Sequence, residues 1–159
     1  MRSNSFWRSV FITALIAAVL DLAGAIFSFK ASRGAFPVNI LKYIAGGLLK
    51  DKAMNGGTEM HLLGGVLHYF ISLIWTVLFY FMYPKLKFLH RNYMFNAFVY
   101  GILIWCIMNL VVLPLSAWKA PISFQNLKEI IKAVSILILC VALPIAFRSK
   151  KYFQSNVPN

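Results

Sequence analysis

Four long apolar runs, at residues 10–29, 62–83, 94–115 and 130–147, fill most of this 159-residue chain. Each run has about 20 residues, the length with which an α-helix crosses the ~30 Å hydrocarbon core of a bilayer. Lipid offers no hydrogen bonds to the backbone, so a spanning segment must be a helix or part of a closed barrel. These runs lack the two-residue alternation of barrel strands. The sequence therefore predicts an all-α membrane protein with a single domain, built as a bundle of four transmembrane helices.

The composition supports a membrane environment. The chain is 60% hydrophobic and only 13% charged, whereas soluble domains have about 25% charged residues. In a soluble protein the formal net charge of +12 would indicate a nucleic-acid partner. Here the basic residues flank the apolar runs, which predicts membrane lipid as a partner and argues against nucleic-acid binding. The residues expected to anchor the chain at the interface are Lys42, Lys50, Lys52, Lys85, Lys87 and Arg91.

An even number of spans places both termini on one side of the membrane. On that side, residues 84–92 and 148–152 are short basic segments without acids, and such segments favour the cytoplasm. We therefore expect both termini to be cytoplasmic. Arg2 and Arg8 before the first run, with Ala23-Gly24-Ala25 inside it, also fit a cleaved signal peptide. The run continues past that site, which favours an uncleaved first helix.

The first loop, residues 30–59, is longer than a structureless connection in a compact domain usually is. Apolar residues recur at roughly helical spacing within 38–50, and Gly56-Gly57 ends the pattern. An amphipathic helix at the membrane interface is the preferred interpretation, with a re-entrant hairpin bent at Gly46-Gly47 as the alternative. The polar tail, residues 154–159, is expected to be disordered.

Asp21 lies close to the middle of the first run, where a carboxylate needs a partner, water or a proton. Alanine, glycine and serine residues stand three and four positions away along one helical stripe, and small residues let helices approach closely. The stripe predicts that Asp21 faces the interior of the bundle. There it either exchanges a proton or forms a hydrogen bond that holds two helices together.

The start of the second span places His61, His68 and Ser72 on a similar helical face. His61 and His68 are two turns apart, about 10 Å along a helix, which is too far to bind one metal ion together. His68 is the deeper histidine, where an imidazole relays protons or bonds to a backbone carbonyl. Neither His61 nor His90 supplies an obvious second haem ligand for His68. We therefore expect no metal ion and no cofactor.

In the third span, Asn109 lies upstream of Pro114, and an amide at that depth usually joins helices by hydrogen bonding. Pro114 is expected to bend or end the helix. The sequence has no Gly-rich phosphate loop, no Ser-His-Asp order and no HExxH motif. These absences argue against an ordinary hydrolase, and a non-enzymatic role is favoured.

The string His68-x3-Ser72, followed by Tyr83-Pro84-Lys85-Leu86-Lys87, resembles the core of the YagU-like family of bacterial inner-membrane proteins. Asn109-x4-Pro114-Leu115 resembles the end of that family's third helix, although its members tend to carry a histidine where this chain has Asn109. The resemblance covers about the middle third to half of the chain. It implies a small multi-span inner-membrane protein with a long first extracytoplasmic loop, and it implies no particular reaction.

The preferred hypothesis is a small inner-membrane protein that binds or conducts a proton, an ion or a small solute through a polar bundle interior. Asp21, His68 and Asn109 form the expected pathway, with Ser72 and His61 in support. Four helices enclose only a narrow interior, so a conducting path would favour a homo-oligomer. The alternative is a structural or adaptor protein, in which the same residues only fix helix packing and the basic loop contacts lipid or a partner protein.

Overall fold

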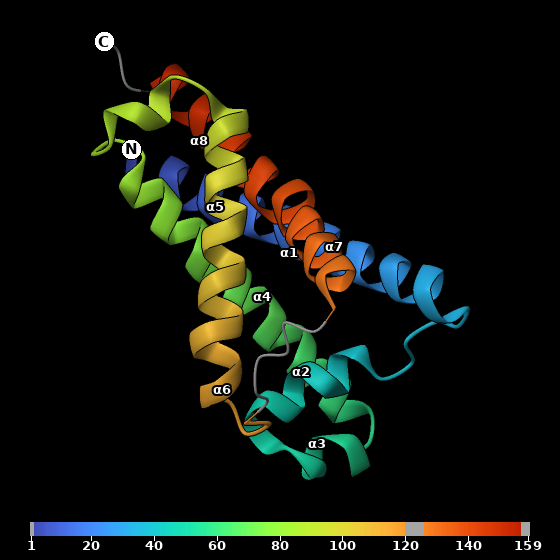
Figure 1. Ribbon diagram of the computed structural model, residues 1–159. Coiled ribbons are helices and arrows are strands. Elements are labelled where there is room, and N and C mark those ends of the chain that lie inside the picture. The colour runs from blue at the N-terminus through green and yellow to red at the C-terminus, as the bar shows by residue number, and fades with distance from the viewer. Residues whose placement is uncertain (1, 120–125, 157–159) are drawn as a thin grey trace.

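Four long apolar helices make up the computed structural model, which describes residues 2–119 and 126–156 (Figure 1). Ser5–Arg33, Thr58–Met82, Tyr93–Leu115 and Leu127–Ser155 are each long and apolar enough to cross a membrane. No strand occurs in the described part of the chain. The predicted all-α bundle of four transmembrane helices is therefore confirmed, and the protein is a multi-pass membrane protein.

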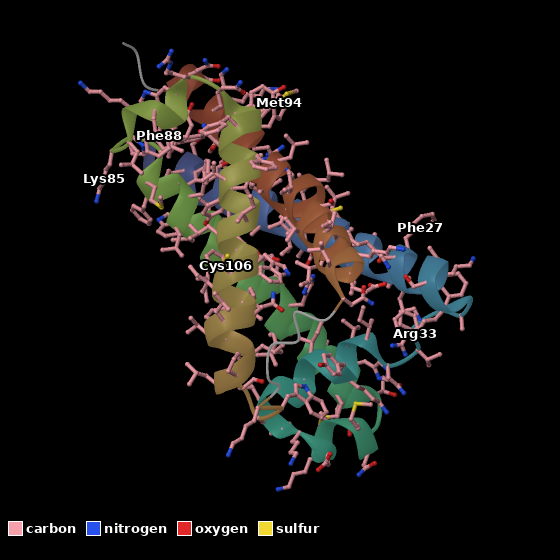
Figure 2. All side chains as sticks on the ribbon, in the orientation of Figure 1. Phe27, Arg33, Lys85, Phe88, Met94 and Cys106 are labelled. Carbon is pink, nitrogen blue, oxygen red and sulfur yellow. The ribbon has the colours of Figure 1, made fainter. Side chains whose placement is uncertain are left out.

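Large apolar side chains point outward over much of the molecule, as Phe27, Phe88 and Met94 do in Figure 2. These three side chains are 75%, 54% and 61% exposed. A soluble monomer rarely exposes large continuous apolar patches. Lipid is therefore the natural solvent for the outer faces of the helices.

Two of the four spans are single helices and two are interrupted. The first span belongs to α1 (Arg2–Arg33), and the second is α4 (Thr58–Met82). The third consists of α5 (Tyr93–Ile107), the π-helix η2 (Met108–Val112) and α6 (Leu113–Leu115). The fourth consists of α7 (Leu127–Ile136), the π-helix η3 (Leu137–Ala142) and α8 (Leu143–Asn156). A short 3-10 helix, η1 (Lys87–His90), joins α4 to α5.

Each π-helix ends two residues before a proline. Pro114 and Pro144 are each preceded by a wide turn, and the carbonyls four residues earlier, at Leu110 and Cys140, lie inside η2 and η3. A proline has no N–H for that carbonyl, and its ring collides with it. A wider turn gives the carbonyl room, so the helix runs past Pro114 and ends only after Leu115.

One end of the bundle, called here the terminal end, holds both chain termini. The rings of Phe6 in α1 and Tyr152 in α8 lie 5.8 Å apart there, and Figure 1 shows the N and C labels at the same end. Tyr80 and Ile145 are fully buried, and Phe79 is 1% exposed. The terminal end is therefore closed by tightly packed, mostly aromatic side chains.

The opposite end, called here the loop end, holds the first loop. This loop forms α2 (Ile40–Leu49) and α3 (Asp51–Asn55), with a bend at Lys50, whose φ is +50°. α2 packs against α4 so closely that a Cβ on Gly64 would lie 1.9 Å from the carbonyl oxygen of Leu41. Lys42 also donates from Nζ to the Gly56 carbonyl at 2.7 Å. These contacts fix the loop helices to the bundle.

Two sequence-based expectations about local structure need correction. The alternative of a hairpin bent at Gly46-Gly47 is wrong, because α2 runs straight through both glycines as a helix. The tail was expected to be disordered from residue 154, but α8 continues to Asn156. The stacking of Tyr83 on Phe153, with ring centroids 5.0 Å apart, holds the end of α8 in place. The remaining residues, 157–159, lie outside the described residues.

Candidate functional site: a cavity at the Asp21–His68 pair

Asp21 and His68 face each other across the contact between α1 and α4. The His68 Nε2 atom lies 3.8 Å from the Asp21 Oδ2 atom and 3.0 Å from the carbonyl oxygen of Ala18. A carbonyl can only accept, so the Ala18 contact places a hydrogen on Nε2. The neutral imidazole therefore carries its hydrogen on Nε2, the ring atom that lies nearest the Asp21 carboxylate.

The small-residue stripe of α1 explains why Asp21 reaches this position. Ala14 and Ala17 on the stripe are fully buried, and Ala18 is 5% exposed, so α1 approaches its neighbours closely. One turn beyond Asp21, a Cβ on Gly24 would lie 3.0 Å from both Cys140 Sγ and Ile136 Cγ2. The small side chains therefore bring Asp21 between α4 and the fourth span, on the inward face that the sequence predicts.

The pair opens into a cavity of about 270 Å³. The side chains of Asp21 and His68 are 22% and 15% exposed, so both remain reachable from this space. Ser72 and Ser116 add hydroxyl groups, and the rest of the wall is mostly aromatic and aliphatic. The remaining lining residues are Tyr43, Ile44, Gly47, Ile71, Trp75, Ile104, Met108, Val112, Leu113, Trp118, Leu137 and Val141. Small-molecule sites in proteins have this character, an apolar wall with a few converging polar groups.

Both π-helices contribute to the cavity wall. Met108 and Val112 come from η2, and Leu137 and Val141 come from η3. Single-turn π-helices inside α-helices are often found at functional sites, because they shift the register of the side chains that follow. The coincidence of both interruptions with one cavity is the feature that most distinguishes this region from ordinary helix packing.

Trp118 covers the cavity at the loop end. Its Nε1 atom donates to the Tyr43 carbonyl at 2.9 Å, and its ring stacks on Tyr43 with centroids 5.1 Å apart. Gly46 makes this contact sterically feasible, since a Cβ there would lie 2.1 Å from Trp118 Cζ2. The Ala117 N–H also donates to the Gly47 carbonyl at 2.8 Å. The turn after α6 is therefore fastened to α2.

The other expected site residues are not gathered at this cavity, except for Ser72. Asn109 lies in η2, where its Nδ2 atom donates to the Trp105 carbonyl at 2.9 Å, so its amide serves the backbone of its own helix. It does not line the cavity of Asp21 and His68. His61 lines a separate, largely apolar groove on the outside of α4. Of the expected site residues, Asp21, His68 and Ser72 therefore line one cavity.

The basic residues expected at the interface have different surroundings. Lys85, Lys87 and Arg91 are exposed in the connection around η1, and Lys50 and Lys52 are exposed at the loop end. Lys42 is instead partly buried by its bond to the Gly56 carbonyl. This lysine therefore has a structural contact that the sequence did not indicate.

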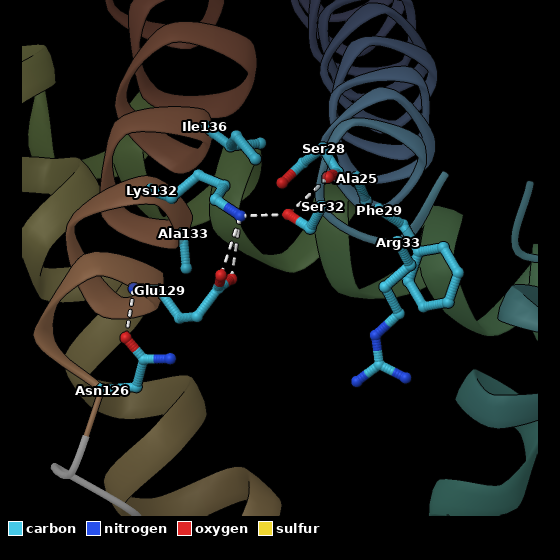
Figure 3. A pocket seen from close by; sticks show the side chains of 10 residues that line it. All are labelled: Ala25, Ser28, Phe29, Ser32, Arg33, Asn126, Glu129, Lys132, Ala133 and Ile136. Carbon is cyan, nitrogen blue, oxygen red and sulfur yellow. Dashed lines mark hydrogen bonds and ion pairs between the residues drawn. The ribbon is translucent and has the colours of Figure 1, made fainter. Parts of the chain in front are cut away.

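A second, more polar groove of about 510 Å³ lies between the ends of α1 and α7 (Figure 3). Lys132 forms an ion pair with Glu129 at 3.0 Å and donates to the Ser32 hydroxyl. Arg33 lines the same groove, with its guanidinium 5.1 Å from the centre of the Phe29 ring. The groove lies on the stripe of α1 that continues from Asp21 through Ala25 and Ser28. It is exposed and charged, in contrast to the cavity beneath Trp118.

Among the described residues, no group of three His, Cys, Asp or Glu side chains is placed to hold a metal ion. Comparison with known proteins adds no function, because no family model, no curated protein and no solved structure matches this chain. The chemistry of the Asp21–His68 cavity therefore has to be argued from its own geometry.

Proposed function

We propose that this protein carries protons across a bacterial inner membrane through the Asp21–His68 pair, together with a small, largely apolar solute bound in the cavity. The proposal rests on one observation: inside a membrane bundle, a carboxylate and an imidazole lie 3.8 Å apart, and both line the same cavity. Ionisable residues within spanning helices that face a cavity are typical of proton and solute pathways. The resemblance to YagU-like proteins agrees with an inner-membrane location.

The side chains that line the cavity favour a small solute that is mostly apolar. At about 270 Å³, the cavity is near the lower end of the size range of small-molecule sites. Trp75 and Trp118 offer ring surfaces, while Ser72 and Ser116 offer hydroxyl groups. A solute with one polar group directed at Asp21 and His68 and an apolar part against the tryptophans fits this distribution.

The closed terminal end supports a carrier rather than an open channel. Below the cavity, Phe79 and Tyr80 are at most 1% exposed, and the Tyr100 hydroxyl donates to the Trp75 carbonyl at 2.7 Å. A pathway to that side therefore requires the helices to move. The π-helices η2 and η3, which border the cavity, are the natural places for such a change of register. With cytoplasmic termini, the cavity in this conformation faces the extracytoplasmic side.

The decisive experiment measures proton flux in liposomes that contain purified protein and an internal pH-sensitive dye, under an imposed pH gradient. We expect the wild type to dissipate the gradient, and Asp21→Asn and His68→Ala to reduce the flux to that of protein-free liposomes. Glu129→Gln and His61→Ala are the controls, since they change a carboxylate and a histidine that lie outside the cavity, and both should keep wild-type flux.

The alternative, a structural or adaptor protein, makes the opposite prediction. If the pair only fixes helix packing, the wild type shows no flux above protein-free liposomes, and the two cavity variants lose thermal stability instead. That result would reject the proposed function, even if all four variants insert correctly into the membrane.

A further inference from the structure

A second polar network lies at the terminal end, and the proposed function does not use it. Arg148 in α8 donates from Nε to the Thr13 hydroxyl at 2.9 Å. The same hydroxyl lies 3.0 Å from the Tyr80 hydroxyl, which in turn lies 3.0 Å from the Ser9 hydroxyl. Thr13 and Tyr80 are fully buried. The network therefore reaches from the surface, at Arg148, into the tightly packed part of the bundle.

The donor directions in this network follow from the number of hydrogens available. The Thr13 hydroxyl gives its single hydrogen to the Ser9 carbonyl at 2.7 Å. Its oxygen must then accept from both Arg148 and Tyr80, so the Ser9 hydroxyl donates to Tyr80. Thr13 is thereby saturated, and it holds the guanidinium of Arg148 in one orientation.

The positive charge of Arg148 has no counter-charge within the described residues. The ion pairs found there join His68 with Asp21 and Lys132 with Glu129, and neither includes Arg148. Asp21 lies eight residues beyond Thr13 on α1, about 12 Å along the helix axis. The Nε atom bonds to Thr13, which leaves the four N–H groups of the two terminal nitrogens without a protein acceptor in the described structure. A partly buried charge in this condition is costly unless an anion accompanies it.

Aromatic side chains surround this network at the terminal end, as is typical of the level of lipid headgroups. Phe6 packs on the rings of Trp7, Tyr80, Phe81 and Tyr152, with centroids 5.5 to 5.8 Å apart. Belts of tryptophan and tyrosine mark the membrane–water interface. The exposed bases Arg8, Lys85 and Lys151 lie in the segments that meet at the same end. An anion at Arg148 would therefore sit where the phosphate groups of one leaflet lie.

We infer that Arg148, held by Thr13, binds the phosphate group of an anionic phospholipid in the leaflet at the terminal end. A guanidinium with two adjacent free NH₂ groups matches a phosphate in a bidentate manner, which an ammonium group cannot do. The site is independent of the Asp21–His68 pair. Its ligand class is a phosphodiester carrying net negative charge, recognised at the headgroup.

The test is native mass spectrometry of the delipidated, detergent-solubilised protein with phosphatidylglycerol or phosphatidylcholine of the same acyl chains. The wild type should bind one phosphatidylglycerol in preference to phosphatidylcholine. Arg148→Gln should lower that preference at least about tenfold, the size expected when one charge-assisted hydrogen-bonding group is lost. Lys151→Gln removes the same charge from an exposed position on α8 and should leave the preference nearly unchanged.

A second variant and a competition with inorganic phosphate complete the test. Arg148→Lys retains the charge without the planar fork and should also weaken phosphatidylglycerol binding, which covers the case in which Arg148→Gln fails to fold. Inorganic phosphate in molar excess should not displace the lipid. The inference is overturned if the wild type shows no preference, if Arg148 variants keep it, or if inorganic phosphate alone occupies the site and removes it.

Discussion

The terminal end and the loop end of this bundle are built from the same four helices and yet differ in packing and chemistry. At the terminal end, Tyr80 and Ile145 are fully buried, and the hydroxyl of Tyr80 lies between those of Ser9 and Thr13. At the loop end, a cavity separates the spans, and Asp21 and His68 remain partly exposed within it. One end of the bundle is therefore packed closed, and the other contains a cavity.

The difference between the two ends arises from a few alanine and proline residues. Alanines at positions 14, 17 and 18 bring α1 against its neighbours on the terminal side of Asp21. Nearer the cavity, the third and fourth spans each contain a wide turn, η2 before Pro114 and η3 before Pro144, and both turns line it. Figure 1 shows α1 and α6 running apart toward the loop end. The space between them is where α2 and Trp118 complete the wall of the cavity.

The largest expected effect comes from truncating the same residue type at the two ends. Ile145→Ala removes a fully buried side chain in α8 and should cost about 3 kcal/mol of unfolding free energy, within the usual range for buried isoleucine. Ile71→Ala enlarges a cavity that already exists and should cost about 1 kcal/mol, because fewer contacts are lost. Denaturant unfolding in detergent micelles, followed by circular dichroism, measures both. Equal costs would refute the contrast between the ends.

Much of the fold could be predicted from the sequence. The lengths of the apolar runs indicate four spans because bilayer thickness fixes helix length, and small residues around Asp21 indicate which face of α1 is buried. A helix within the first loop was also expected from spacing alone, and α2 is present. These features depend on local pattern, which a single sequence displays directly.

The candidate site could be predicted only in part. His68 meets Asp21 because α1 and α4 pack together, and a shared inward orientation was enough to suggest it. Asn109 donates to the backbone of its own span, at the Trp105 carbonyl, and helical spacing cannot tell such a bond from one to a neighbouring helix. Trp118 and Arg148 were overlooked because their partners, Tyr43 and Thr13, are 75 and 135 residues distant in sequence. Long-range contacts of this kind leave no trace in spacing.

A smaller effect is expected at the cover of the cavity, where two adjacent glycines in α2 should respond in opposite directions. Gly46→Ala places a methyl group 2.1 Å from the Trp118 ring, which must move away from Tyr43. Gly47→Ala meets no atom within 4 Å and should stabilise the helix by about 0.5 to 1 kcal/mol. Gly46→Ala should instead destabilise the protein by about 1 kcal/mol, despite the same gain in helix propensity.

Iodide quenching of tryptophan fluorescence provides a second measurement of the cover. Gly46→Ala should increase the quenchable fraction, because Trp118 leaves its place over the cavity, while Gly47→Ala should leave it unchanged. If both variants behave alike, Trp118 does not depend on Gly46, and the loop end is less ordered than its contacts with α2 indicate.

The smallest expected difference in stability is between removing a buried hydroxyl at the terminal end and removing an exposed one. Tyr80→Phe removes the hydroxyl between Ser9 and Thr13 and should cost about 1 kcal/mol, since interhelical hydrogen bonds in membranes are worth about 0.6 kcal/mol and a partner is left unpaired. Tyr69→Phe removes an exposed hydroxyl 3.4 Å from the Phe11 carbonyl and should change nothing measurable. Denaturant unfolding of both variants in the same detergent measures the two changes in stability. An equal response would mean that water reaches Tyr80, and the terminal end would then not be the closed side of the bundle.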